Sequence, residues 1–243
     1  MILLFFAIEN SAITCTVTKE QKEKVEKLFP EKEIIHIANG IELSEWSPHK
    51  SELGQAVKWK LENVTPGKRV VGLFGHLKPK KGLDFFINSI VLSGLQNKIF
   101  LLISGETNET VEKKLKSAQI EFFISPFLDR FELLAWYPVC DAVAVPSFYD
   151  GMPNVILEAA ALSIPIIASN VGGMKDMLVN GKHGFTFHPV DEQSCALAIT
   201  DFFQKTENEL FQMGQNGKKL IEDFYTAKIE AGNYYKIFTQ VLT

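Results

Sequence analysis

Cysteine is scarce in this 243-residue sequence, which has only Cys15, Cys140 and Cys195. The three form no CxxC pair and no Cys/His spacing, so the sequence argues against a disulfide framework and predicts no metal site. We expect the thiols to be buried as small apolar side chains. Free thiols also favour a reducing compartment, which indicates a cytoplasmic protein.

A surplus of basic charge and a long apolar run are missing as well. The 25 Lys and Arg residues stand against 29 Asp and Glu, a net charge of -4, whereas nucleic-acid binding needs a dense surplus of Lys and Arg. We therefore expect no nucleic-acid partner. The apolar run over residues 1–8 is far shorter than the ~20 residues of a membrane span and lacks a basic flank. We interpret this run as the end of a core element. A peripheral location at the inner face of a membrane is compatible with this interpretation.

Regular alternation of apolar runs and helical stretches begins after residue 69. Strands buried on both faces read as continuous apolar runs, which is typical of a parallel sheet covered by helices on both sides. The sequence therefore predicts an α/β fold, a Rossmann-like, doubly wound parallel sheet, followed by three helices. The predicted strands are residues 70–74, 99–103, 121–124, 142–145, 164–168 and 185–187, and the helices are 192–203, 207–224 and 226–242.

A shorter αβ pattern precedes this domain. Residues 12–18 and 33–38 read as strands on either side of a charged helix over 19–28, and Asn39-Gly40 then forms a turn. Residues 42–66 are polar and irregular, with Pro48 and Pro66 as breakers, which is typical of a hinge segment. The chain thus reads as if it opens in the middle of one fold and passes through a hinge into another.

A cationic loop follows the strand predicted over residues 70–74. His76, Lys78, Lys80 and Lys81 lie between Gly75 and a helix that begins after Gly82. A helix N-terminus offers unpaired amides, and Lys supplies a compact charge, so the loop can bind a diphosphate. The alternative is a solvated surface turn. The loop is neither GxGxxG nor a P-loop, so the dinucleotide and NTPase fingerprints are absent.

Two carboxylates flank a second strand-to-helix turn. Asp150 lies in the turn after the strand 142–145, and Glu158 follows eight positions later on a helix. Both can point into the crevice at the carboxyl ends of parallel strands. Pro153 suits the first turn of a helix, and Gly151 permits close approach of a ligand. Alternatively, Asp150 only caps the helix and Glu158 is a solvated surface residue.

A third turn, over residues 169–174, contains Gly172 and Gly173 after the strand predicted at 164–168. A Gly-Gly pair by itself is more often a tight turn than a ligand cradle. Its place at another strand's carboxyl end makes it a candidate for ligand contact.

In this order and spacing, the motifs resemble the C-terminal, donor-binding domain of the retaining GT-B glycosyltransferases called glycosyltransferase family 4, or group 1. The resemblance extends from about residue 12 to the end of the chain. It rests on IANGIE at 37–42, FGHL at 74–77, Lys81-Gly82, Pro146-Ser147, DGMPN at 150–154, Glu158-Ala159 and NVGG at 170–173.

The resemblance implies a role for each candidate residue. Glu158 would accept hydrogen bonds from the ribose of a nucleotide, and Asp150 would meet the donor sugar. His76 and Lys81 would lie on the diphosphate, and residues 125–132 would wall the base. The predicted catalytic residues are Asp150, Lys81 and His76, and the predicted donor-binding residues are Glu158, Gly151, Met152, Pro153, Asn154, Gly75, Gly172 and Gly173.

The resemblance also divides the chain. Residues 1–40 would be a remnant of an N-terminal acceptor domain, 41–66 a linker, 67–225 the nucleotide-sugar donor-binding domain and 226–243 a helix that crosses back toward the first domain. The chain would then be a fragment of a longer enzyme, the partner of an acceptor domain on another polypeptide, or a donor-binding module without turnover of its own. The face on which the acceptor domain would dock also predicts a partner or self-association.

The implied reaction is transfer of a glycosyl group with retention. The donor substrate would be a UDP-, GDP- or ADP-sugar and the acceptor a glycan, lipid or small molecule, with no metal and no resident cofactor. Three alternatives remain open: a noncatalytic nucleotide-sugar-binding subunit, a GT-B relative such as a nucleotide-sugar epimerase, and a doubly wound binding protein unrelated to sugars.

Two positions differ from the family's pattern. Asp150 stands where the family has Glu, and His76 stands where it has Arg. A neutral imidazole replaces a permanent bidentate charge. The sequence therefore predicts weak diphosphate binding that strengthens as the pH falls through the titration of His76.

Overall fold

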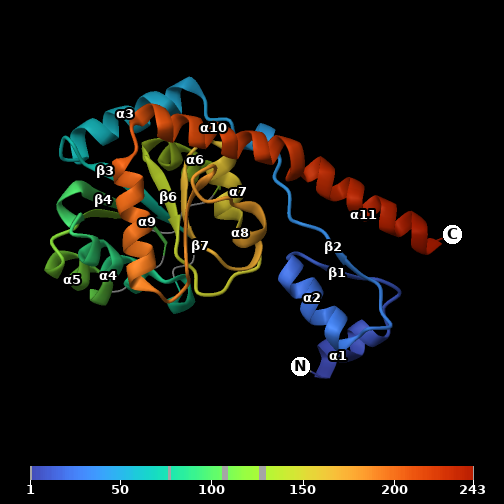
Figure 1. Cartoon of the computed structure of the whole chain (residues 1–243). Helices are drawn as coiled ribbons and strands as arrows, with labels where there is room; N and C mark the ends of the chain where they lie inside the picture. Colours follow the sequence, from blue (N-terminus) through green and yellow to red (C-terminus); the bar gives the residue numbers. More distant parts are fainter. Residues whose placement is uncertain (1, 76–77, 106–108, 126–129, 243) are drawn as a thin grey trace.

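Six parallel strands form the central sheet of the larger part of the molecule (Figure 1). The computed structural model describes residues 2–75, 78–105, 109–125 and 130–242. Each strand matches an apolar run of the sequence to within two residues at either end, so the predicted α/β sheet is confirmed. The strands are β3 (Arg69–Phe74), β4 (Ile99–Ser104), β5 (Glu121–Ser125), β6 (Ala142–Val145), β7 (Ile166–Ser169) and β8 (Gly184–Phe187).

The strand order is β5-β4-β3-β6-β7-β8. The chain first moves outward from β3 through β4 to β5, then returns to the other side of β3 with β6. The order therefore reverses between β3 and β6, and the helices that follow these two strands, α4 (Leu83–Ser93) and α7 (Asn154–Ala161), pack on opposite faces of the sheet. In doubly wound sheets this switch point is where ligands bind.

Helices cover both faces of the sheet, and successive strand residues face opposite layers. Val70 belongs to the core under one layer and Val71 to the core under the other. The Val71 side is covered by α4 (Leu83–Ser93), α5 (Glu109–Ser117) and α9 (Glu192–Gln204). The Val70 side is covered by α3 (Lys50–Asn63), α6 (Arg130–Trp136), α7 (Asn154–Ala161), α8 (Gly172–Met177) and α10 (Glu207–Phe224).

The thiols are only partly as expected. Cys140 and Cys195 are buried in these two layers, and burial raises the pKa of Cys195 to about 12. Cys15 is exposed, which corrects the prediction that all three would be buried. Cys15 is the middle residue of β1 (Thr14–Thr16), a strand of the small two-stranded sheet, and its side chain is on the exposed side, whereas the next residue, Thr16, is buried.

A small N-terminal unit lies apart from the six-stranded sheet and beneath the far end of the last helix, α11 (Ala227–Leu242) (Figure 1). It contains α1 (Ile2–Glu9), β1 (Thr14–Thr16), α2 (Lys19–Leu28) and β2 (Ile34–His36), with β1 and β2 paired in parallel. The run predicted as the end of a core element is α1, in which Ile8 is buried but Phe6 is 64% exposed. A two-stranded sheet is at best marginally stable by itself, so this unit depends on its neighbours.

The N-terminal unit is tied to the rest of the chain at three places. The amide of Lys19 donates to Asp176 at 2.8 Å, and α2 packs against α8. The amide of Gly40 donates to Glu230 at the start of α11 (Ala227–Leu242), also at 2.8 Å. Farther along α11, Gln240 lies 3.4 Å from Glu33.

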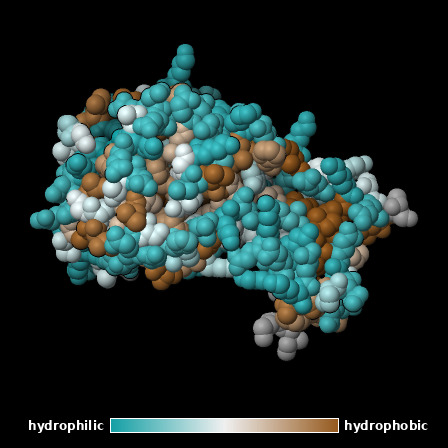
Figure 2. Space-filling view, viewed as in Figure 1, coloured by the Kyte–Doolittle hydropathy of each residue, from teal (hydrophilic) through white to brown (hydrophobic). Residues whose placement is uncertain are grey.

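Apolar side chains gather on the surface where the end of α11 passes the N-terminal unit (Figure 2). We call this the α11 patch. Its exposed large apolar side chains are Phe5, Phe6, Leu28, Phe238, Val241 and Leu242. In the part of the chain that the structure describes, no helix combines the length and apolar character needed to cross a bilayer.

Irregular structure was expected over residues 42–66, and the structure corrects this. The segment forms the short 3-10 helix η1 (Leu43–Trp46) and the 14-residue helix α3. Trp59 of α3 packs edge-on against Phe100 and Phe123 of the sheet. Sequence periodicity misses α3 because its Val57 and Leu61 are 59% and 79% exposed, so its apolar residues do not lie on one buried face.

Candidate functional site

Three loops meet at the switch point, after β3, β6 and β7. The amide of Phe148 donates to the carbonyl of Lys80 at 2.9 Å, which joins the first loop to the second. Gly82 has φ 71°, and a Cβ there would overlap the carbonyl oxygen of Pro146. The amide of Gly173 donates to the carbonyl of Gly151 at 2.5 Å, which joins the third loop to the second. The backbone therefore holds all three loops in one arrangement.

Lys81 and Asp150 form an ion pair at the centre of this arrangement. Their side chains are 27% and 15% exposed, so both are largely withdrawn from solvent. The Ser147 hydroxyl donates to the same Asp150 oxygen at 3.3 Å, and Ser169 donates to the backbone carbonyl of Ser147 at 2.5 Å. The structure thus brings together the predicted cation and the predicted sugar-binding carboxylate, and adds two serines.

The glycines of the third loop are explained by packing. Gly172 has φ 50°, and a Cβ at this position would overlap the carbonyl oxygen of Asp150. The amide of Gly173 is already bonded to Gly151. Met152 is 7% exposed and belongs to the apolar core, so its backbone is the part that can meet a ligand. Gly172 and Gly173 therefore shape the turn that carries Asp150.

Glu158 lies on α7, one turn beyond the residue that begins it. Pro153 is the N-cap of this helix, with φ -67°. Asn154 and Glu158 line a cavity of about 200 Å³ together with residues 40–42, 45–46 and 157. Lys81, Ser147 and Pro153 line a separate space of about 20 Å³, which is room for one water. Lys81, the partner of Asp150, and Glu158 thus line two separate spaces rather than a shared one.

Tyr137 is a residue that the sequence analysis missed. It is fully buried, and its hydroxyl donates to Oε2 of Glu158 at 2.5 Å. Burial, and next the charge of Glu158, raise the pKa of Tyr137 well above its ordinary value. The sequence contained a signal for it: Tyr137 lies in the apolar stretch 133–140. A tyrosine buried in such a stretch needs an acceptor for its hydroxyl, which indicates a polar partner in the core.

The loop after β3 is described at its two ends. Gly75 has φ 103°, and its amide donates to the carbonyl of Ser104 at 3.0 Å, which ties the loop to β4. His76 lies outside the described residues, so its contact with a diphosphate stays a prediction. The base wall expected at 125–132 includes residues 126–129, which also lie outside them.

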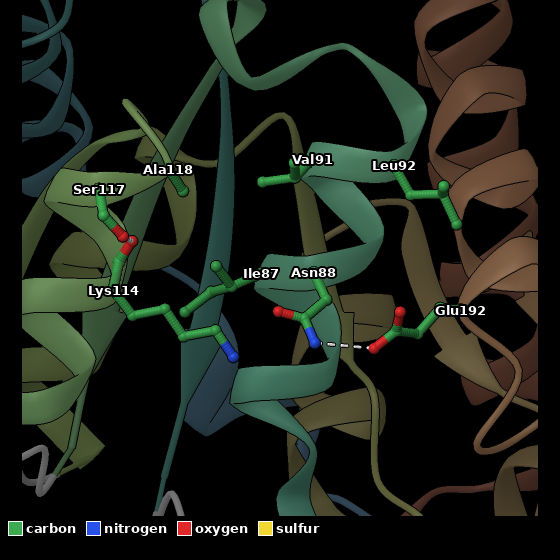
Figure 3. A pocket seen from close by; sticks show the side chains of 8 residues that line it. All are labelled: Ile87, Asn88, Val91, Leu92, Lys114, Ser117, Ala118 and Glu192. Carbon is green, nitrogen blue, oxygen red and sulfur yellow. Dashed lines mark hydrogen bonds between the residues drawn. The ribbon is translucent and has the colours of Figure 1, made fainter.

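A larger cavity, of about 450 Å³, lies between α4, α5 and α9 (Figure 3). Its floor is apolar, with Ile87 and Ala118. Its polar groups already have partners: Asn88 donates to Glu192 at 2.8 Å, and Lys114 donates to Asp84. It belongs to the outer helical layer, away from the three loops.

The chemistry available at the strand ends is recognition of anions and hydroxyls. The loops supply the Lys81 ammonium, the Asp150 carboxylate and the Ser147 hydroxyl, and α7 supplies the Asn154 amide and the Glu158 carboxylate. Over residues 2–75, 78–105, 109–125 and 130–242, no group of three or more His, Cys, Asp or Glu side chains could hold a metal ion.

The sequence profile described as "Glycosyl transferases group 1" matches residues 58–220. The chain belongs to this family. Among its relatives is the capsular polysaccharide biosynthesis glycosyltransferase CapM of Staphylococcus aureus, which is 25% identical over 92% of the chain. The chain spans 57% of the length of CapM.

Solved structures share the fold of this group 1 glycosyltransferase chain. Anabaena HepE, solved in complex with UDP-glucose, superposes with a TM-score of 0.84 at 17% identity, over 98% of this chain and 66% of HepE. The C-terminal domain of a glycosyl transferase group 1 family protein, LpcC, from Francisella tularensis has a TM-score of 0.64 at 24% identity. That match covers 77% of this chain and the whole of the LpcC domain. What these structures share with this chain is the GT-B fold.

Proposed function

We propose that this chain supplies the nucleotide-sugar-binding half of a retaining glycosyltransferase. The observation that carries the proposal is the grouping of Lys81, Ser147 and Asp150 on loops at the switch point of the sheet. Ligands of open parallel sheets bind at this point. An ammonium beside a carboxylate suits a donor that presents an anionic diphosphate and a polyhydroxylated sugar.

Each site residue has a distinct role in this proposal. Lys81 binds the diphosphate oxygens, and Asp150 accepts a hydrogen bond from the donor sugar. Glu158 accepts hydrogen bonds from the ribose hydroxyls. The amides of Gly151 and Asn154 complete the contacts with sugar and phosphate oxygens.

Transfer breaks the bond between the anomeric carbon and the diphosphate oxygen. Negative charge grows on that leaving oxygen, and a preorganised cation beside it lowers the barrier. Lys81 supplies that cation. The leaving oxygen then takes the proton of the acceptor hydroxyl on the same face of the sugar, so the new bond forms with retention and needs no protein nucleophile.

The proposal also assigns a part to each segment of the chain. Residues 1–40 form part of an acceptor domain, 41–66 link it to the donor-binding domain at 67–225, and 226–243 cross back to it. The α11 patch is the surface that a separate acceptor polypeptide, or a second copy of the chain, covers, because a contiguous exposed apolar surface marks an interaction site. Since the three cysteines are free thiols, we assign the protein to the cytoplasm.

Thermal unfolding with UDP, GDP, ADP and their sugar conjugates tests donor binding. A ligand at 100 times its Kd stabilises by about 2.7 kcal/mol, which raises Tm by roughly 5 to 10 °C for a domain of this size. We expect one nucleotide family to produce this shift in the wild type and a much smaller one in Glu158→Ala. Glu192→Ala, on α9, is the matched control and should retain the full shift. Absence of any nucleotide-dependent shift in the wild type contradicts the proposal.

Turnover separates an enzyme from a noncatalytic binding subunit. With an acceptor domain supplied, the wild type is expected to transfer sugar, and NMR of the product should show the anomeric configuration of the donor. The alternative of a noncatalytic subunit is favoured if the protein binds nucleotide sugars but neither the wild type nor Asp150→Glu transfers. An inverted product contradicts retention while leaving donor binding intact.

A further inference from the structure

The ring and the hydroxyl of Tyr137 make different contacts in the structure. Tyr137 begins the short 3-10 helix η4 (Tyr137–Val139) and is fully buried. Its ring packs edge-on against Trp46, with centroids 5.6 Å apart, and 4.5 Å from Phe74. A phenylalanine would satisfy both ring contacts. The hydroxyl is explained by Glu158, whose Oε2 accepts its hydrogen bond.

Glu158 meets this phenol on one side and the 200 Å³ cavity on the other. The cavity is lined by α7 residues Asn154 and Glu158 and by residues 40–42 and 45–46. An ionised carboxylate has two oxygens and about four acceptor positions, and Tyr137 donates to one of these oxygens, Oε2. Two vicinal hydroxyls, as on a ribose, are a donor set that one carboxylate accepts.

The hydrogen bond fixes the Glu158 carboxylate before a ligand arrives. A freely rotating Glu loses rotamer freedom when it binds, whereas one already held by a buried donor loses less. The Tyr137 ring is itself held between η1 and the end of β3. Because burial and the charge of Glu158 keep the pKa of Tyr137 far above neutrality, the phenol remains a donor throughout the working pH range.

We propose that Tyr137 is a positioning residue for the ribose: its hydroxyl fixes Glu158 so that the carboxylate meets the 2′ and 3′ hydroxyls of the bound nucleotide. The inference rests on the proposed function, because it assumes that a nucleotide occupies the site. It assigns to a core tyrosine a share of the preference for ribonucleotides.

Tyr137→Phe tests this with two ligands, the nucleoside diphosphate that binds the wild type and its 2′,3′-dideoxy analogue. Isothermal titration calorimetry should show that the variant binds the ribonucleotide about fivefold more weakly, which corresponds to the cost of immobilising one side chain, Glu158, on binding. Affinity for the dideoxy analogue should change less than about twofold on the same reasoning. In the Glu158→Gln background, Tyr137→Phe should have little further effect.

Two controls separate positioning from general loosening of the core. Tyr225→Phe removes a hydroxyl from another tyrosine packed against the same core cluster and should leave both affinities unchanged. Binding of the dideoxy analogue by Tyr137→Phe shows that the variant is folded.

The possible failures are distinguishable. If the wild type binds no nucleotide, the proposed function fails. If the wild type binds and Glu158→Gln weakens binding, but Tyr137→Phe does not, the inference about Tyr137 is overturned alone. Equal weakening of both ligands by Tyr137→Phe overturns it too, because a ribose contact cannot influence a ligand without ribose hydroxyls.

Discussion

Replacing Asp150 by Asn should tighten the binding of a nucleoside diphosphate. Lys81, the cation assigned to the diphosphate, is paired with the Asp150 carboxylate, which also accepts from Ser147. A diphosphate must therefore compete with Asp150 for the ammonium, or bind beside a carboxylate that repels it. Asn keeps the size of Asp and one acceptor oxygen but replaces the other oxygen by an NH2 donor and removes the charge, so both costs disappear.

The size of the effect follows from the exposure of the pair. Unit charges ~4 Å apart attract by about 4 kcal/mol at an effective dielectric constant of about 20, but exposed pairs contribute only about 0–1 kcal/mol net after solvent screening. The Lys81 and Asp150 side chains are 27% and 15% exposed, which favours the upper end of that range. About 1 kcal/mol corresponds to roughly a fivefold lower Kd for Asp150→Asn.

Calorimetric titration of the wild type, Asp150→Asn and Asp150→Glu checks this prediction. Asp150→Glu keeps the charge and should bind the diphosphate with nearly wild-type affinity. The parent nucleoside, which has no phosphate, should bind all three alike. Sugar transfer by Asp150→Asn should fall even as diphosphate binding improves, because the contact to the donor sugar is weakened. Unchanged or weaker diphosphate binding by Asp150→Asn would refute the assignment of Lys81 to the diphosphate.

Three further substitutions, one of them with a matched control, test the interactions that stabilise the fold. Gly172→Ala should lower the free energy of unfolding in urea by about 1–3 kcal/mol, because φ is 50° and a Cβ would overlap the Asp150 carbonyl; Gly181→Ala, with φ 76° and open space, should cost less. Burial lowers the pKa of His183, so the unfolded chain takes up the proton first, and stability should fall as the pH drops below ~6.5. His183→Asn should flatten that pH dependence between pH 7.5 and 5.5, and an unchanged slope would contradict it. Arg69→Met should cost about 2 kcal/mol, since Arg69 donates to the carbonyls of Phe202 and Lys205, without changing nucleotide affinity.

The strands could be predicted from the sequence because both faces of the sheet are buried. Each strand from β3 to β8 is then a short apolar run, and the last helices carry clear capping signals, such as the Thr206–Glu209 capping box of α10. Helix α3 was not legible. It packs on the core through Ala56 and Trp59, while Val57 and Leu61 face outward. Its apolar residues therefore do not recur at the spacing of an amphipathic helix, and the sequence did not predict it.

The sequence predicted which charged residues belong to the site, but not which residues they contact. Lys81, Asp150 and Glu158 stand out in the sequence because charged residues follow buried strands directly. Their partners did not stand out: Ser147 is an ordinary turn residue, and Tyr137 lies 21 positions before Glu158 in an apolar stretch. Ligand contact by Gly172 and Gly173 stays a prediction, and the structure adds a packing role against the Asp150 turn that the sequence did not indicate.

The sequence by itself determined the fold class, the family and the chemical character of the strand-end loops, since apolar periodicity and local motifs are properties of neighbouring residues. The tertiary structure alone decided that β6 lies beside β3, because strand order depends on how the crossovers pack rather than on local pattern. That adjacency pairs Lys81 with Asp150 across 69 positions of sequence. It also brings the buried phenol of Tyr137 to Glu158, where a hydrogen bond in a low-dielectric core can hold a carboxylate in place.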